Sequence, residues 1–333
     1  MRGFWSKLAC ALMLGGAMVA GAVAAERQVV RVGILQFGTV SWELDVMQRE
    51  GFAEREGVEI RIVPLALKDA ANVAIQGGEV DVIANDWIWV SRMRSEGRDY
   101  VFSPYSQAVG GVSVRPDAGI ASFADLKGKR LGIAGGALDK SWLLLRAYAR
   151  KTVGEDAATF VRPQFAAPPL LNELVMRGEL PAAMNFWHFS ARLSAAGMAE
   201  LITMPQILAG LGIEDALPLV GWVFSERWAR ANPGAIEGFL RASAAAKDLM
   251  LASDAAWEAL RPLMRAENED TFIALREGFR AGIPRADGED GEREAERVAA
   301  RVFAILAAEG GPALVGRSDA LAQGTFWRRG GAQ

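Results

Sequence analysis

The chain of 333 residues contains a single cysteine, Cys10, and a single histidine, His188. So few of these residues argue strongly against Cys/His zinc sites and against cysteine–histidine catalytic pairs. No basic block stands out among 37 lysines and arginines against 40 acids, so nucleic acid is not an expected partner. No cofactor and no bound metal is expected. A chain that is 51% hydrophobic and 23% charged is globular, and its length suits one large or two medium domains.

The first 25 residues have the order of a secretory signal. Arg2 and Lys7 precede an apolar run over residues 8–23, and small residues follow it. This order predicts export and cleavage near Ala24 or Ala25. The alternative is a retained membrane anchor, which needs about 20 apolar residues, more than this run has. No later segment is expected to span a bilayer. The mature chain has no cysteine and therefore no disulfide, and we expect it in the periplasm.

The rest of the chain alternates short β-branched runs with helical patterns. Strands are predicted at residues 29–35, 58–65 and 80–84, and helices at 41–54, 69–76 and 87–95. This alternation predicts a parallel sheet covered by helices. A second α/β unit follows over residues 115–205. After a strand at 219–224 the pattern is helical to the end, and no internal repeat is apparent.

We therefore predict a signal peptide over residues 1–25 and two α/β lobes. The first lobe is discontinuous, with residues 26–114 and 206–333. The second lobe, residues 115–205, is inserted into it, so the chain crosses between the lobes twice.

Several segments carry a family pattern: 32–37 (VGILQF), 74–81 (AIQGGEVD), 120–131 (IASFADLKGKRL), 132–141 (GIAGGALDKS), 178–187 (GELPAAMNFW) and the Asn232-Pro233 helix start. Together they resemble the periplasmic substrate-binding proteins of ABC importers, in the nitrate/sulfonate/taurine class. The resemblance implies a type II-like two-lobe fold with mostly parallel sheets flanked by helices and a helical C-terminal region. It also implies a monomer without enzymatic activity, which captures a small organic solute by closure of two lobes. Its partners would be a membrane permease and its ATPase.

Ligands of open α/β sheets bind beyond the carboxyl ends of the strands. Loops at these ends in the two lobes would face each other across a cleft, and a bridging solute would favour the closed state. The candidate ligand-binding residues in and near these loops are Phe37, Thr39, Trp42, Asp69, Asn85, Asp86, Trp87, Gly136, Asp139, Lys140, Ser141, Asn185, Trp187 and His188.

Several of these residues have two interpretations. The Gly135-Gly136 pair either offers N–H groups to an anion or makes a tight turn. Asp139 either caps the following helix or reaches a ligand. Trp87 and Trp187 follow strand ends and either stack on a ligand or pack in the core.

Charge adds one hypothesis about the ligand. Asp69, Asp86 and Asp139 are predicted at the cleft, with Lys68 and Lys140 nearby, and buried carboxylates need donors. The basic residues expected for a bare sulfonate or nitrate are few. We therefore expect a solute with a planar or aliphatic body and hydrogen-bond donors, zwitterions included.

Two rival functions stay open. One is a pyrimidine-synthase-like enzyme on the same fold, with Asp86, Asp139 and His188 for acid–base work. The other is a metal-ion carrier using the same carboxylates. The sequence has no D-x-D-x-D loop of the kind that hard cations favour. For His188, a hydrogen-bonding or core role is expected rather than a metal ligand.

Overall fold

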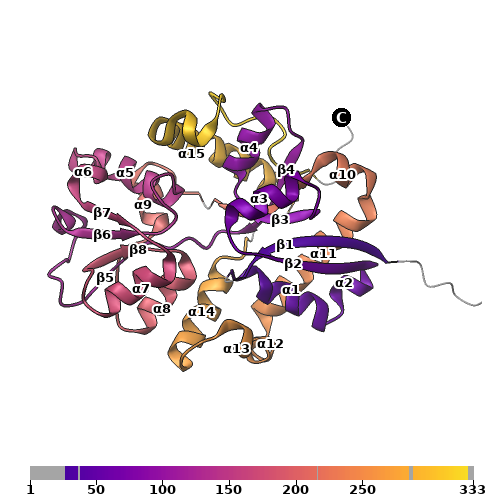
Figure 1. Ribbon diagram of the computed structural model, residues 1–333, viewed down its shortest axis with the longest axis horizontal. Helices are drawn as coiled ribbons and strands as arrows, with labels where there is room; N and C mark the ends of the chain where they lie inside the picture. Colours follow the sequence, from indigo (N-terminus) through magenta and orange to yellow (C-terminus); the bar gives the residue numbers. More distant parts are fainter. Residues whose placement is uncertain (1–26, 37, 216, 285–287, 329–333) are drawn as a thin grey trace, which may run out of the picture.

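The computed structural model describes residues 27–328 except 37, 216 and 285–287, so the expected signal peptide and Phe37 lie outside the described residues. Two five-stranded sheets lie in the two halves of the protein (Figure 1). We call the half around the first sheet lobe 1 and the half around the second sheet lobe 2.

The sheet of lobe 1 has the strand order β2-β1-β3-β10-β4. Strand β10 runs opposite to the other four strands, so the sheet is mostly parallel, as expected. The strands are β1 (Gln28–Leu35), β2 (Val58–Leu65), β3 (Val82–Asn85), β4 (Tyr100–Ser106) and β10 (Val220–Ser225). The helices around them are α1 (Val40–Arg49), α2 (Phe52–Arg55), α3 (Lys68–Gln76), α4 (Trp87–Ser95), α10 (Glu226–Ala231) and α11 (Pro233–Ala252).

Strand β4 was not predicted, because Pro104 interrupts its sequence pattern. Proline cannot donate to a ladder and is tolerated at irregular positions. The pairing with β10 is irregular at this place: Gly221 faces Pro104 while Val220 faces Ser106, so Tyr105 is bulged out of register. The bulge accommodates the proline in the strand.

The sheet of lobe 2 has the order β7-β6-β8-β5-β9, and β5 runs opposite to the other four strands. The strands are β5 (Val112–Val114), β6 (Arg130–Ile133), β7 (Arg162–Phe165), β8 (Ala182–Met184) and β9 (Ala199–Ile202). The helices are η1 (Phe123–Leu126), α5 (Lys140–Val153), α6 (Ala157–Phe160), α7 (Pro168–Met176), α8 (Trp187–Ala195) and α9 (Met204–Gly210).

The chain first passes from lobe 1 to lobe 2 between β4 and β5, and this segment runs close to the turn after β8. A Cβ on Gly110 would lie 1.9 Å from the carbonyl oxygen of Asn185, so only glycine lets the chain pass there. Strand β5 ends at Val114, the predicted boundary, and already pairs within the second sheet. Helix α9 spans the second predicted boundary at residue 205 and contacts α5 of lobe 2.

The two lobes share a sequence pattern, which corrects the expectation of no internal repeat. Asn72, Gly78, Glu79, Asn85 and Trp87 recur a hundred positions later as Asn172, Gly178, Glu179, Asn185 and Trp187. The α3–β3–α4 unit of lobe 1 and the α7–β8–α8 unit of lobe 2 are thus equivalent, and the two sheets have matching strand orders. Few of the intervening residues agree, which hides the repeat in a single sequence.

Helix α15 (Gly288–Val315) packs against α4 of lobe 1 and α5 of lobe 2 (Figure 1). Its segment Arg293–Val315 is long and apolar enough to cross a membrane by length and composition, contrary to the sequence expectation. Val298, Val302 and Phe303 are buried in the protein core, and Gly311 breaks the helix with a non-helical conformation. One third of the most apolar window is buried, and these residues form the face of α15 that packs in the protein.

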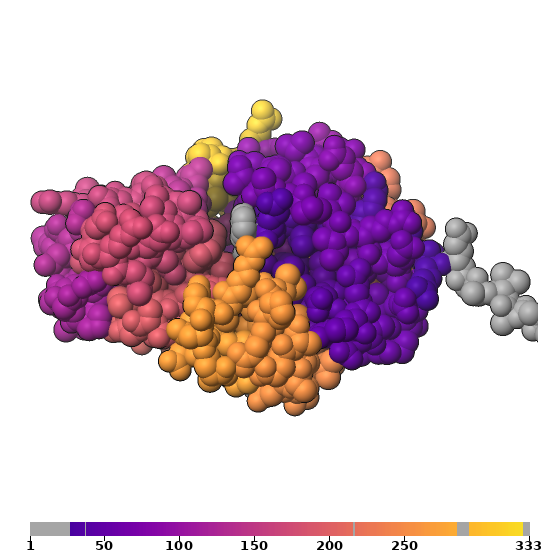
Figure 2. All heavy atoms as spheres, turned by 60° about the horizontal axis from the view of Figure 1, so that its bottom comes forward, coloured from indigo at the N-terminus to yellow at the C-terminus, as the bar shows by residue number. Residues whose placement is uncertain are grey.

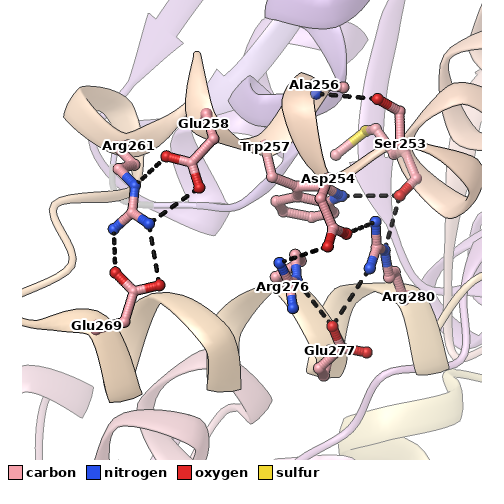
Figure 3. A network of polar contacts seen from close by, with 11 residues as sticks. Ser253, Asp254, Ala256, Trp257, Glu258, Arg261, Glu269, Arg276, Glu277 and Arg280 are labelled. Carbon is pink, nitrogen blue, oxygen red and sulfur yellow. Dashed lines mark hydrogen bonds and ion pairs between the residues drawn. The ribbon is translucent and has the colours of Figure 1, made fainter.

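A network of ion pairs ties together α12 (Asp254–Glu258), α13 (Arg261–Met264) and α14 (Glu269–Ala281). Figure 3 shows Arg261 between Glu258 and Glu269, and Arg280 reaching Asp254 at 2.7 Å. Isolated surface pairs contribute little, whereas a network of several charges holds a geometry. These helices lie below the junction of the two halves in Figure 1, and α13 and α14 supply one wall of the cavity described next.

Candidate functional site

A cavity of about 670 Å³ lies between the two lobes. Lobe 1 contributes the loop after β1 and the α13–α14 region, and lobe 2 contributes α7 and α8. Figure 2 shows the two halves side by side, with the α12–α14 region in front of the gap. The residues on its walls include Gln36, Thr39, Trp42, Pro169, Asn172, His188, Arg192, Met264 and Glu267. The volume suits a small organic solute.

Two predicted tryptophans meet at the junction of the lobes. Trp42 on α1 and Trp187 on α8 make an edge-to-face contact with ring centroids 6.1 Å apart. Both rings also contact Phe279 of α14, at 6.0 and 6.3 Å. Trp42 reaches the cavity wall although it is only 4% exposed. The aromatic contact therefore couples the position of the lobes to the cavity.

His188 lines the same cavity. Its ring lies 4.5 Å from that of Phe189, and both ring nitrogens are buried without a hydrogen-bond partner among the described residues. Burial, and then the charge of Arg192, lower the pKa of His188 to about 4. The imidazole is therefore neutral at neutral pH.

Arg192 connects the two lobes at the cavity wall formed by α8 and the α13–α14 region. From α8 it donates to the carbonyl oxygens of Met264 (2.8 Å) and Arg265 (3.1 Å), and it pairs with Glu267. Most of its hydrogen-bonding capacity is spent on lobe 1. Arg192 therefore acts as a link between the lobes.

A second link consists of three charged residues. Asp86 Oδ2 accepts hydrogen bonds from Lys68 Nζ (2.6 Å) and Lys140 Nζ (2.8 Å). Lys68 begins α3 in lobe 1, whereas Lys140 begins α5 in lobe 2. Burial raises the pKa of Asp86, but the charges of Lys140 and Lys68 outweigh it and hold this pKa well below its usual range. The carboxylate thus stays ionised between two ammonium groups.

Asp139 and the preceding glycines form a local turn. Asp139 Oδ1 accepts from the backbone N–H of Ser141 (2.9 Å) and Trp142 (3.4 Å), which is the N-cap of α5. Gly135 and Gly136 both have φ above +80°, and a Cβ on Gly135 would lie 2.5 Å from Asp139 Oδ2. The geometry matches the tight-turn and capping interpretations, and Ser141 lies half-buried in the first turn.

Replacing Asp139 with alanine should therefore cost about 1 kcal/mol of folding stability, the usual loss for a missing N-cap. Asparagine at this position should retain most of that stability, because its side-chain oxygen caps equally well. Urea unfolding of the three proteins measures the difference. A loss that is equal in both variants would show that the charge of Asp139, and not its cap, supports the turn.

Asn85 and Asn185 are structural in both lobes. Asn85 Nδ2 donates to Asn72 Oδ1 (2.7 Å), and Asn185 Nδ2 donates to Asn172 Oδ1 (2.9 Å). Each Oδ1 accepts the next backbone N–H, that of Asp86 or Phe186, at 2.8 Å. These side chains, at most 4% exposed, fix the strand-end turns that carry Asp86 and Trp187.

Trp87 is a correction to the sequence expectation. Its side chain is fully buried in the hydrophobic core, so it cannot stack on a solute in this conformation. Asp86, the residue before Trp87, is the one that contacts lobe 2, through Lys140. Asp69 is exposed in the first turn of α3, and Gly136 is half-buried.

The structure brings some of the predicted residues together in two places. Thr39, Trp42 and His188 line the cavity, with Trp187 packed behind it. Asp86 and Lys140 form the charged link together with Lys68, which was noted only as a nearby cation. The walls from α7, from α13–α14 and from α8 beyond His188 were missed, because amphipathic patterns do not say which helix reaches across to another lobe.

The part of the chain that the structure describes contains no cluster of side chains suited to binding a metal ion. No group of three or more His, Cys, Asp or Glu side chains there is arranged to hold an ion.

A model of the family described as NMT1/THI5 like matches residues 43–256, more than half of the chain. The chain belongs to the NMT1/THI5-like family. No curated protein sequence matches it.

Solved structures with the same fold include two sulfonate-binding proteins. The periplasmic aliphatic sulphonate-binding protein SsuA of Escherichia coli is 17% identical to this NMT1/THI5-like protein, with a TM-score of 0.66 over 88% of this chain and 95% of that chain. The alkanesulfonate-binding protein SsuA of Xanthomonas axonopodis pv. citri, bound to MOPS, is 17% identical, with a TM-score of 0.66 over 91% and 99%. The predicted two-lobe fold is confirmed.

The fold is shared with an enzyme as well. The desulfurization enzyme DSZB is 15% identical, with a TM-score of 0.57 over 90% of this NMT1/THI5-like chain and 98% of that chain. Fold alone does not separate a binding protein from an enzyme.

Proposed function

We propose that the protein is the exported, periplasmic solute-binding component of an ABC importer. It captures a small organic solute between its lobes and delivers it, as a monomer, to a membrane permease with its ATPase. The observation that carries this proposal is the cavity of about 670 Å³ whose walls come from both lobes. The sulfonate-binding function of the two SsuA proteins supports it.

Closure is the proposed signal to the permease. The contacts of Asp86 with Lys140 and of Arg192 with Glu267 join the lobes on two sides, and a solute that adds to them favours the closed state. We place the two crossovers just outside the predicted lobe boundaries, before β5 and after α9. The lobes are then residues 26–111 with 211–333, and residues 112–210.

A binding role is favoured over catalysis by the state of His188. Its nitrogens contact no carboxylate among the described residues, so the neutral imidazole has no partner that would orient it as a general base. Incubation of the protein with each solute that binds, followed by mass spectrometry, should return the solute unchanged. Formation of a product would favour the enzyme alternative.

Solute binding is testable with the native tryptophans. We expect at least one of MOPS, phenyl sulfate, phenylethylamine and nicotinamide to change the fluorescence of the mature protein saturably, because Trp42 lines the cavity. Thr39→Trp should weaken that binding at least about tenfold by filling the cavity without removing a capping bond.

Thr152→Trp is the matched control, since Thr152 is exposed on α5 away from the cavity. It should bind like the unmodified protein. Equal affinity of both variants, or binding of none of the four solutes, would contradict capture in this cavity.

A further inference from the structure

The carboxylate of Asp86 is held between cations that come from opposite lobes. Lys68 Nζ and Lys140 Nζ both donate to its Oδ2, while its Oδ1 accepts the backbone N–H of Trp89 at 2.8 Å. The residue is only 5% exposed. Asp86 thus joins the two lobes and has no oxygen free for a ligand.

The two lysines, in contrast, keep unused donors. An ammonium group has three N–H donors, and one from each lysine goes to Asp86. The side chain of Lys68 is 48% exposed and that of Lys140 is 17% exposed. A second anion can therefore approach the pair from the side that faces solvent.

The cluster of Lys68, Asp86 and Lys140 is positively charged. Two ammonium groups and one carboxylate give these three paired groups a net charge of +1. Asp139 precedes Lys140, and its negative charge also acts on Lys140, while its Oδ1 caps α5. Helix α3 begins at Lys68 without a side-chain cap, which adds positive potential from its amides. A monoanion neutralises the cluster, whereas a dianion leaves an excess negative charge beside a buried carboxylate, which is unfavourable at low dielectric.

We propose that Lys68 and Lys140 form a head-group site for a monoanionic solute, and that Asp86 makes this site reject dianions. This inference rests on the proposed function, because a solute must enter between the lobes to meet both lysines. It assigns Lys68 to the site and gives Asp86 the role of a built-in counter-ion that sets ligand charge.

Phenyl sulfate and phenyl phosphate test the proposal, because they have nearly the same shape and differ by one charge above the second phosphate pKa of about 6. At about pH 7.5, calorimetry on the mature protein should give phenyl sulfate at least about tenfold tighter binding than phenyl phosphate. Asp86→Asn should remove or reverse this preference, since it raises the cluster charge to +2 while asparagine still caps α4.

Glu79→Gln is the matched control: it removes an exposed carboxylate in the turn after α3, at the end of that helix away from Lys68, and the preference should remain. Lys140→Met should lose most phenyl sulfate binding. The same preference in Asp86→Asn and the unmodified protein would overturn the charge-selecting role. Failure of both phenyl esters to bind would overturn the head-group site, and binding of nicotinamide or phenylethylamine in that case would leave the proposed function standing.

Discussion

Replacing Lys247 with methionine should lower the free energy of unfolding of the mature protein by about 3–5 kcal/mol. Lys247 on α11 lies 2.7 Å from Glu43 Oε2, and Glu43 on α1 is fully buried. Removal of the ammonium group leaves the carboxylate buried without its counter-charge. Breaking a buried pair from one side costs far more than the pair contributes as a whole.

Further contacts surround this pair. Ser243 donates to Glu43 and accepts from Lys247 (2.9 Å) and from Trp222 Nε1 (3.0 Å). The ammonium group also lies 4.2 Å from the centre of the Tyr105 ring. Because Glu43 follows Trp42 directly in α1, the network also fixes the helix that carries one cavity wall.

Urea unfolding followed by far-UV circular dichroism measures the loss. Glu43→Gln combined with Lys247→Met should recover part of it, since no charge is then left buried. Lys151→Met, at an exposed position, should change the stability by no more than about 0.5 kcal/mol. A loss below about 1 kcal/mol for Lys247→Met would mean that water or a rearranged side chain compensates Glu43.

The local elements followed well from the sequence. Helix α4 has the bounds that were predicted, Trp87–Ser95, because Asp86 is a strong N-cap before an apolar run. Strand β2 also has its predicted bounds, since its alternation of apolar and polar residues is regular. In both cases the signal lies within about ten consecutive residues.

The cavity could be predicted only in part, because its walls depend on contacts across the lobes. The strand-end rule named the loop after β1 and His188, and the structure places both on the cavity wall. It could not tell that the ring of Trp87 turns into the core while its equivalent in lobe 2, Trp187, packs against Trp42. The neighbours of an aromatic ring, and not its place in the sequence, decide this outcome.

Acidification should destabilise the folded protein through its single histidine. The pKa of His188 is about 4 when folded, against 6.5 for an ordinary histidine, because burial and Arg192 disfavour the charged ring. Between these values the unfolded chain binds more protons, so stability falls as the pH drops from about 6.5 to about 4. The full difference of 2.5 pH units corresponds to about 3 kcal/mol.

His188→Phe isolates this effect, because the ring nitrogens have no described partners to lose and the neighbours of the ring are aromatic. The variant should lose about 3 kcal/mol less stability than the unmodified protein between neutral pH and pH 4. Since the chain has one imidazole, its NMR titration needs no assignment and should give a midpoint near 4. A midpoint near 6.5 would show that the ring is solvated, and the acid sensitivity of the fold would then have to come from the carboxylates that are held ionised by ion pairs, such as Asp86.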